Sequence, residues 1–127
     1  MKKVRTVVLN YNQPVFTVET VDALFRQKEI EHEIVVVDNN STTENYTLLE
    51  QNLSKNAFLL RSEDNLGYAI ENNIGCKYKS QFKPDYYFIV NNDVQIFSES
   101  LIANLIKAIE SNIEKNVVAA SPLVDIS

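Results

Sequence analysis

Short apolar runs recur along this chain, separated by segments whose apolar residues follow helical spacing. The runs, each expected to form a strand, cover residues 4–9, 33–37, 57–60, 86–90 and 117–120. Most of them are continuous and not alternating, which is typical of strands covered on both faces of a parallel sheet. Alternation of such strands with helices predicts right-handed βαβ units and an α/β fold, a Rossmann-like, doubly wound, mostly parallel sheet.

Helix signals occupy each of the four segments between consecutive apolar runs. Pro14 is expected in the first turn of one helix. Ser41 to Glu44 fit a capping box, with Ser41 as N-cap of the next. A third helix is expected over about 66–79, and Ser98 can cap a fourth. The third helix contains Asn72, Asn73 and Gly75, which are poor helix formers, so we expect a constraint other than helix propensity there.

Composition bounds the class of protein. The chain has 127 residues, of which 45% are hydrophobic and 23% charged, as expected for one globular domain spanning 1–127. Its net charge is −5 and its few cations are dispersed after the basic start, so no nucleic-acid partner is expected. No run approaches the roughly 20 apolar residues that cross a bilayer, and Val7 to Leu9 is too short for a signal peptide. These features predict a cytoplasmic protein.

Two residue types with reactive side chains occur once each. Cys76 is the single cysteine, which excludes an internal disulfide and a thiolate metal cage and favours a small core residue. His32 is the single histidine and is expected in a solvated loop before the second strand. Nucleophile schemes that need a Ser-His or Cys-His pair are therefore disfavoured.

Polar side chains follow three of the predicted strands. The first strand ends in Asn10-Tyr11-Asn12, the second in Asp38-Asn39-Asn40-Ser41 and the fourth in Asn91-Asn92-Asp93. In doubly wound sheets ligands bind at the carboxyl ends of the strands, so these side chains are expected at one crevice. Asn and Asp are also good turn residues, which is the alternative explanation for each cluster alone.

Other chemistries of α/β proteins lack their motifs here. The chain has no Gly-x-x-x-x-Gly-Lys phosphate loop, no Gly-x-Gly-x-x-Gly after the first strand and no Gly-x-Ser-x-Gly elbow. What remains is carboxylate and amide oxygen chemistry, which suits a hard cation such as Mg²⁺ or Mn²⁺.

Taken in order, four segments resemble the family 2 glycosyltransferases of the GT-A fold, most of all their rhamnosyltransferase-type branch. The segments are Val7 to Asn12, Ile34 to Ser41, Asn65 to Gly75 and Asn91 to Val94, with Ser121-Pro122 as a further similarity. The resemblance covers essentially the whole chain. It implies transfer of a sugar from a UDP- or dTDP-sugar to an acceptor hydroxyl, with inversion, in surface polysaccharide synthesis.

The resemblance also implies roles for individual residues. Asn10 and Tyr11 should line the nucleotide pocket, and Asp38 should accept a hydrogen bond from the pyrimidine base. Asn91-Asn92-Asp93 corresponds to the Asp-x-Asp motif of the family, with Asp93 as the metal-binding carboxylate. Asn91 replaces the first Asp, but Mg²⁺ or Mn²⁺ can complete its shell with donor phosphates and water.

Residues between the second and fourth strands are expected to complete the sugar-diphosphate site. Arg61 is a local cation at the end of the third strand and could equally be a surface residue. Gly67 implies unusual backbone angles or a close approach. Asn65 belongs to the same turn and could instead cap the third helix.

No carboxylate of this chain corresponds to the general base of the family, which is expected beyond Ser127. We therefore expect the donor-binding part of a longer enzyme, truncated before the acceptor-binding half and inactive by itself. The acceptor would be a saccharide or a lipid-linked one, in the cytoplasm or at the inner face of the membrane. An edge left uncovered by the missing half would favour a homo-oligomer.

Non-catalytic modules are the competing class. A receiver-like signalling domain needs an acidic pair after the first strand and a Lys on the last, and this chain has neither at residues 10–12 or 117–121. A related enzymatic option, a nucleotidyltransferase, would need a Gly-rich basic loop after the first strand, and that loop is absent too. A nucleotide-binding module without catalysis stays open.

Overall fold

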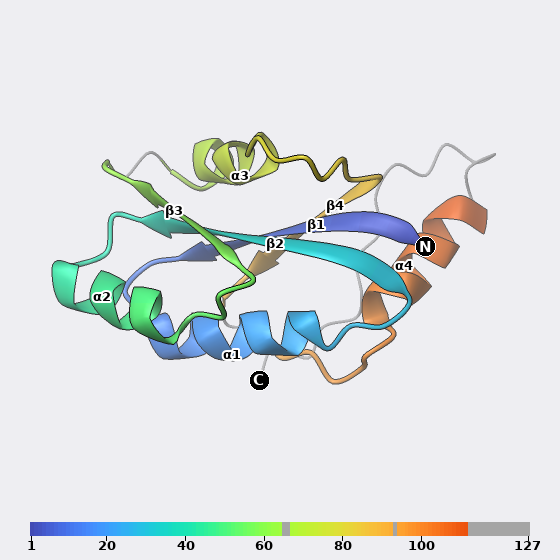
Figure 1. Ribbon diagram of the computed structural model, residues 1–127, viewed down its shortest axis with the longest axis horizontal. Helices are drawn as coiled ribbons and strands as arrows, with labels where there is room; N and C mark the ends of the chain where they lie inside the picture. Colours follow the sequence, from blue (N-terminus) through green and yellow to red (C-terminus); the bar gives the residue numbers. More distant parts are fainter. Residues whose placement is uncertain (65–66, 93, 112–127) are drawn as a thin grey trace.

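Strands and helices alternate along the whole described part of the chain (Figure 1). The computed structural model describes residues 1–64, 67–92 and 94–111, and structural statements below refer to these residues. The predicted fifth strand, 117–120, lies outside them. The elements are β1 (Lys2–Asn10), α1 (Pro14–Phe25), β2 (Ile30–Asn39), α2 (Thr43–Asn52), β3 (Phe58–Ser62), α3 (Tyr68–Cys76), β4 (Tyr86–Asn91) and α4 (Leu101–Ser111).

All four described strands are parallel, in the order β3-β2-β1-β4. From β1 the chain adds β2 and β3 on one side, and it then crosses to the other side of β1 to form β4. The strand order therefore reverses between β1 and β4, which is where doubly wound sheets bind their ligands. The predicted fold class is confirmed.

Helices cover both faces of the sheet (Figure 1). On one face, side chains of α1, α2 and α4, such as Leu24, Leu49 and Ile102, pack with Val8 and Val36 of the central strands. On the other face lies α3, above a smaller cluster that includes Val7, Val35 and Val37. Burial on both faces, expected from the continuous apolar runs, holds for β1 and β2.

Gly75 explains how closely α3 approaches the sheet. A Cβ at this position would overlap the Val7 Cγ1 methyl and would lie 3.2 Å from Cγ2 of Val37. A glycine in a helix interior costs about 1 kcal/mol relative to alanine, and although Gly75 lies near the end of α3, contact with the sheet is what requires it here. The expected constraint on this helix is confirmed for Gly75, while Asn73 is an exposed helical residue.

The prediction that His32 lies in a solvated loop is wrong. Strand β2 begins at Ile30, before the apolar run, because Lys2 to Val4 of β1 supply parallel partners for residues 30–32. The His32 Nδ1 donates to the Leu24 carbonyl (3.1 Å), so Nε2 accepts from the Thr6 hydroxyl (2.5 Å). Burial lowers the pKa of His32 to about 4, and the imidazole is neutral at pH 7.

The predicted helix boundaries also need two corrections. The N-cap of α2 is Thr42, whose hydroxyl accepts from the Asn45 N–H, and not Ser41. The Ser41 hydroxyl donates to Asp38, and its oxygen accepts from the Asn12 N–H and from Asn10 Nδ2, so it is not available to the helix. Helix α3 is shorter than expected and begins after Gly67.

A buried ion pair lies within the sheet beneath the end of α3. Arg5 Nε is 2.6 Å from Glu33 Oε1, and both side chains are at most 7% exposed. The same guanidinium donates to the Cys76 carbonyl and to the Ser80 hydroxyl. Arg5 thereby joins two strands to the segment that leaves α3. Cys76 itself is half-buried, and burial raises its pKa, in keeping with a packing residue.

None of the described helices is both long enough and apolar enough to span a bilayer.

Candidate functional site

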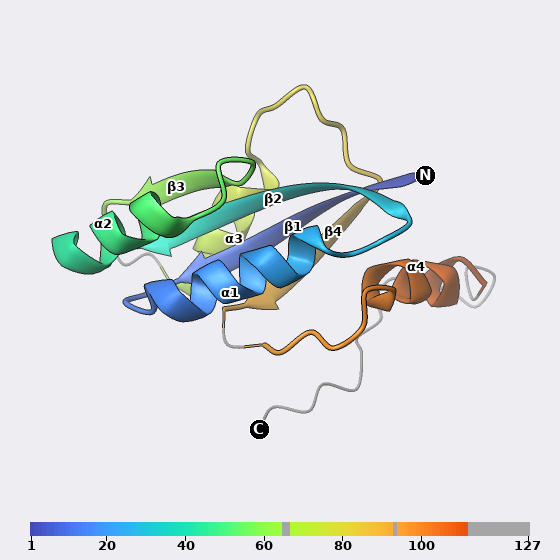
Figure 2. The same cartoon turned by 60° about the horizontal axis from the view of Figure 1, so that its bottom comes forward.

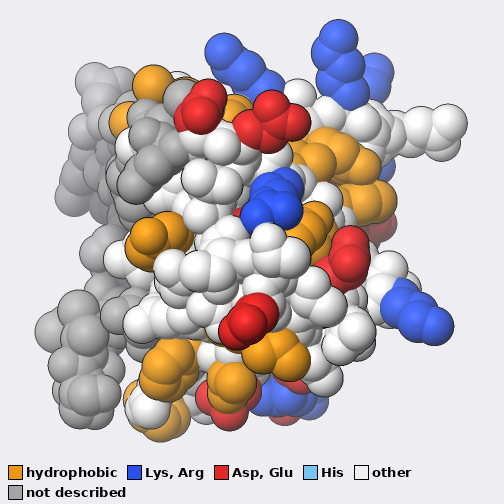
Figure 3. Space-filling model, turned by 90° about the vertical axis from the view of Figure 1, so that its left-hand side faces the viewer, with side chains coloured by type: hydrophobic (Ala, Val, Ile, Leu, Met, Phe, Trp, Pro, Cys, Tyr) orange, Lys and Arg blue, Asp and Glu red, His pale blue; other side chains and the backbone are white. Residues whose placement is uncertain are grey.

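A cavity of about 360 Å³ opens at the carboxyl ends of β1 and β4, at the point where strand order reverses. Small-molecule sites commonly have volumes of roughly 300–1,000 Å³. Figure 3 shows this end of the molecule, where charged side chains are scattered singly over a mostly uncharged surface. The lining is dominated by amides and comprises Leu9, Asn10, Tyr11, Gln13, Asn39, Gly67, Asn91 and Asn92.

Four of the residues predicted for the site meet at this cavity. Asn10 and Tyr11 come from the end of β1, Asn91 from the end of β4, and Gly67 from the N-cap of α3. Tyr11 is 53% exposed, so its ring is accessible to a ligand. Gly67 has φ +89° and open space where a Cβ would lie, so backbone angle and not close approach selects glycine here.

Asp38 is fully buried behind this cavity and its carboxylate is held by neighbours. Oδ1 accepts from Asn10 Nδ2 (2.8 Å) and from the Ser41 hydroxyl (2.6 Å), and Oδ2 accepts from the Ser41 N–H (3.0 Å). Such bonds to a carboxylate are charge-assisted and roughly twice as strong as neutral ones. In this arrangement Asp38 organises Asn10 and the turn after β2.

Arg61 lies on the far side of Asp38 and does not line the cavity. Its Nη2 donates to the Ser41 carbonyl (2.9 Å), and its Nε is 3.8 Å from Asp38 Oδ2. The guanidinium also stacks 4.4 Å from the ring centre of Tyr46, a cation–π contact. Burial, with smaller contributions from Glu50 and Asp38, raises the pKa of Tyr46, so the phenol stays neutral.

Two of the asparagines after strands are explained by turn geometry alone. Asn12 and Asn40 both have φ +53°, a left-handed conformation that asparagine tolerates better than most residues. Asn12 also accepts from the Thr42 N–H and donates its own N–H to the Ser41 hydroxyl. These contacts tie the turn after β1 to the turn after β2, so the structural explanation holds for this pair.

Sequence reasoning missed Thr17 and Glu71, and it did not foresee the bond between Ser41 and Asp38. Thr17 and Ser41 are buried and hydrogen-bonded to Asn10 and Asp38, and Glu71 of α3 is a fully buried carboxylate. A signal for Glu71 existed, because it lies four residues before Gly75 and so shares the helix face against the sheet. Thr17 is one of the buried residues of α1, and in the sequence its hydroxyl was the one sign that it does more than pack against the sheet.

The predicted metal ligand, Asp93, lies outside the described residues, as does Asn65. In the described part of the chain, no three side chains of His, Cys, Asp or Glu are grouped as a metal site would need. The cavity instead offers amide oxygens, which are hard donors, beside Asn92, the neighbour of Asp93. This set fits Mg²⁺ or Mn²⁺ only if a ligand supplies further oxygens.

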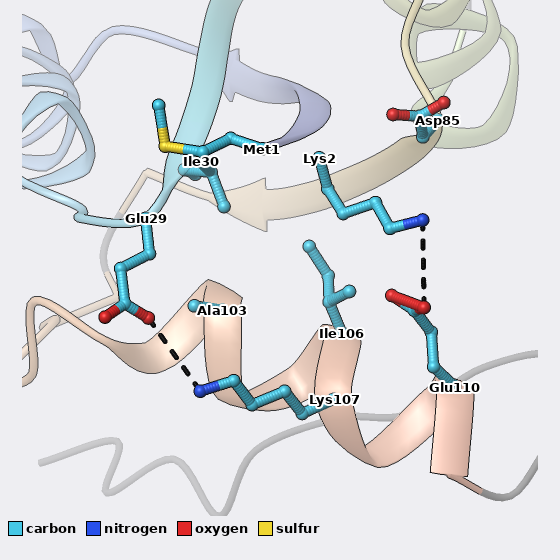
Figure 4. Close-up of a pocket in the computed structure, with 9 residues that line it drawn as sticks. All are labelled: Met1, Lys2, Glu29, Ile30, Asp85, Ala103, Ile106, Lys107 and Glu110. Carbon is cyan, nitrogen blue, oxygen red and sulfur yellow. Dashed lines mark ion pairs between the residues drawn. The ribbon is translucent and has the colours of Figure 1, made fainter.

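A second cavity, of about 480 Å³, lies at the opposite end of the strands, between α4 and the start of β1 (Figure 4). Its charged groups neutralise one another, with Lys2 3.7 Å from Glu110 and Lys107 3.8 Å from Glu29. Although larger, it lies away from the switch point and from every predicted site residue. We therefore assign the functional site to the smaller cavity.

Comparison with protein families identifies the chain. The family described as glycosyl transferase family 2 matches residues 6–126, nearly the whole length. The chain belongs to this family. This match confirms the resemblance read from the four segments at the level of the family, and it supports transferase activity in general. It also argues against a receiver-like signalling domain.

Solved glycosyltransferases share the fold of this family 2 chain. One is the mannosyltransferase PcManGT from Pyrobaculum calidifontis in complex with GDP-Man and Mn²⁺, with a TM-score of 0.70 and 21% sequence identity. The match covers 84% of this chain and 32% of the PcManGT chain. Another is S. aureus TarS 1–349 in complex with UDP, with a TM-score of 0.67 and 24% sequence identity. This match covers 89% of the present chain and 33% of the TarS 1–349 chain. TarS 1–349 is also known with UDP-GlcNAc. The present chain thus spans about a third of the length of these enzymes.

A search of curated protein sequences gave no match.

Proposed function

We propose that this chain forms the donor-binding part of a glycosyltransferase that takes a pyrimidine nucleotide diphosphate sugar, UDP- or dTDP-linked, with a divalent cation. The observation that carries the proposal is the amide-lined cavity at the β1/β4 switch point in a family 2 chain. Structural relatives bind GDP-Man, UDP and UDP-GlcNAc, which supports a nucleotide sugar as ligand class.

In this proposal different cavity residues bind different parts of the donor. Asn10 and Tyr11, with Asp38 behind them, would bind the nucleoside, and Asn91 and Gly67 would flank the diphosphate. Asp38 accepts three of the about four hydrogen bonds that a carboxylate can accept, so it can also accept from the base once a local movement opens its buried side chain to the cavity. Arg61 would act through Asp38 and Ser41, since it stands behind both.

A divalent cation would be held by Asp93, amide oxygens of the cavity and the diphosphate of the donor. When bound, such an ion stabilises the negative charge that develops on the departing nucleoside diphosphate. In the transfer itself the bond from the anomeric carbon to the phosphate oxygen breaks, and a bond to the acceptor oxygen forms. The hydroxyl proton passes to a base that none of the described residues is assigned to provide.

Finer features of the function follow from the resemblance and are part of the same proposal. They are a rhamnosyltransferase-like specificity, inversion at the anomeric carbon, a saccharide or lipid-linked acceptor and a role in surface polysaccharide synthesis. The proposed location is the cytoplasm, at the inner face of the membrane where such an acceptor would be met. We further propose that the 127 residues alone transfer little sugar, because the solved relatives are about three times longer.

Titration calorimetry tests the donor proposal. UDP or dTDP should bind the purified chain in the presence of Mn²⁺ and bind more weakly without it. Asp93→Ala should weaken metal-dependent binding about tenfold or more, because the site loses its carboxylate ligand. Asp22→Ala is the matched control, since Asp22 is an exposed acid on α1 and its removal changes the net charge equally.

Absence of heat with both pyrimidine nucleotides would contradict the proposal, as would unchanged metal-dependent affinity in Asp93→Ala. Preferential binding of GDP would retain a nucleotide-sugar site and overturn the choice of a pyrimidine. If the longest natural form of the protein binds the nucleotide but transfers no sugar, a non-catalytic nucleotide-binding module would be favoured.

A further inference from the structure

A continuous hydrogen-bond chain runs beneath the cavity, from the end of β4 to the end of β2. Asn92 Nδ2 donates to the Thr17 hydroxyl (3.2 Å), and Thr17 donates to Asn10 Oδ1 (2.6 Å). Asn10 Nδ2 then donates to Asp38 Oδ1 (2.8 Å). Every donor in the chain points the same way and the last acceptor is a carboxylate, an arrangement in which successive bonds polarise one another.

Helix α1 supplies a second attachment to the same residue. The Thr20 hydroxyl donates to the Asn92 carbonyl (2.8 Å), one turn along α1 from Thr17. Figure 2 shows α1 in front of the sheet beside the end of β4. Thr17 and Thr20 are 0% and 5% exposed, so their hydroxyls are removed from water and depend on these partners.

The two ends of this chain are not neighbours in the sheet. Asp38 is the last residue but one of β2 and Asn92 follows β4, with β1 between the two strands. A donor that binds its base at one end and its diphosphate at the other requires a constant distance between them. The bonds from α1 hold both the side chain and the backbone carbonyl of Asn92, the residue that follows β4.

We propose that Thr17 and Thr20 are positioning residues of the donor site, which hold Asn92 at a set distance from Asp38. The proposal rests on the proposed function for its ligand. Neither threonine lines the cavity, so neither acts by touching the donor. Thr17 acts through both Asn10 and Asn92, and Thr20 through Asn92 alone.

Thr17→Val tests the chain, because valine keeps the shape of threonine and removes the hydroxyl. It leaves Asn10 Oδ1 and Asn92 Nδ2 without this partner, and we expect UDP affinity in the presence of Mn²⁺ to fall about five- to tenfold. Thr20→Val should weaken binding in the same direction, and Thr17→Ser should restore it. Thr47→Val is the matched control, since the Thr47 hydroxyl is exposed and bonds only the Thr43 carbonyl of its own helix.

A ligand-free measurement separates this proposal from the donor hypothesis. In ¹H–¹⁵N spectra, Asp38→Asn should shift the side-chain amide of Asn92 when Thr17 is present and shift it much less in a Thr17→Val background. Equal shifts in both backgrounds would overturn the coupling, as would unchanged UDP affinity in folded Thr17→Val and Thr20→Val proteins. If the natural chain binds no nucleotide, the proposed function fails, and the spectra alone then decide whether Thr17 links the two strand ends.

Discussion

At the residue scale, the ionisation of His32 is coupled to folding. Its imidazole is enclosed between Thr6 of β1 and the Leu24 carbonyl at the end of α1. Because burial disfavours the charged form, the pKa of His32 lies at about 4 in the folded protein, below the ordinary value of 6.5. The histidine is therefore a structural residue of the sheet and not a catalyst.

We expect the protein to become less stable as the pH is lowered from about 6.5 to about 4. In that range the unfolded chain binds a proton on His32 that the folded protein does not, so protonation favours unfolding. From about pH 7 to about pH 5 this residue should reduce the free energy of unfolding by about 2 kcal/mol. Urea denaturation at both pH values measures the change.

His32→Gln supplies the control, because an amide can still donate to one partner and accept from the other. The fall in stability between the two pH values should be about 2 kcal/mol smaller in this variant. The same pH dependence with and without His32 would show that other groups account for it.

At the scale of elements, contact between α3 and the sheet depends on one missing side chain. Gly75 lies against Val7 and Val37, and a Cβ there would overlap Val7. Helix α3 also carries Gly67 at its N-cap, which lines the cavity. Any displacement of α3 would therefore be transmitted to the site.

Gly75→Ala should destabilise the protein by about 1–2 kcal/mol, although alanine is the better helix former, because overpacking outweighs the gain in propensity. Urea unfolding measures this. Asn73→Ala, at an exposed position of the same helix, should be neutral or slightly stabilising. If Val7 is the obstacle, Val7→Ala combined with Gly75→Ala should cost less than the sum of the single changes. If the destabilisation of the double variant equals the sum of the two single changes, Val7 is not the obstacle to a side chain at residue 75.

At the scale of the whole molecule, the face that carries α3 is only partly covered by the residues that the structure describes. Tyr87 and Ile89 of β4 point to this face, opposite Arg5 and Val7 of β1, and are 52% and 38% exposed. Their neighbours on β1 are buried. Adjacent exposed apolar side chains on one face are a feature of association surfaces.

We accordingly expect weak self-association through β4. The weight-average sedimentation coefficient of the wild-type chain should rise with concentration, and Ile89→Lys should reduce that rise by placing a charge in the contact. Thr47→Val, remote on α2, should behave as wild type. A sedimentation coefficient independent of concentration in the wild-type chain would show that this face does not associate.

Local patterns predicted much of the fold and part of the site. Apolar runs and helical spacing located the described strands and helices, and Pro14 marked the start of α1. Polar residues after strands predicted that Asn10, Tyr11 and Asn91 would share one edge, the family resemblance added Gly67, and all four line one cavity. The boundaries were less accurate, because Ser41 was as plausible an N-cap as Thr42 until its hydroxyl was found on Asp38.

The sequence by itself determined which segments form strands and which helices, because hydrophobic periodicity and turn chemistry act between residues close in the chain. Only the tertiary structure decided what their polar side chains do. Arg5 meets Glu33 and His32 meets Thr6 because β1 and β2 pair in one particular register. Thr17 joins Asn10 to Asn92 because β4 returns to the far side of β1. Contacts between residues so distant in the chain depend on strand order and register, which no local pattern contains.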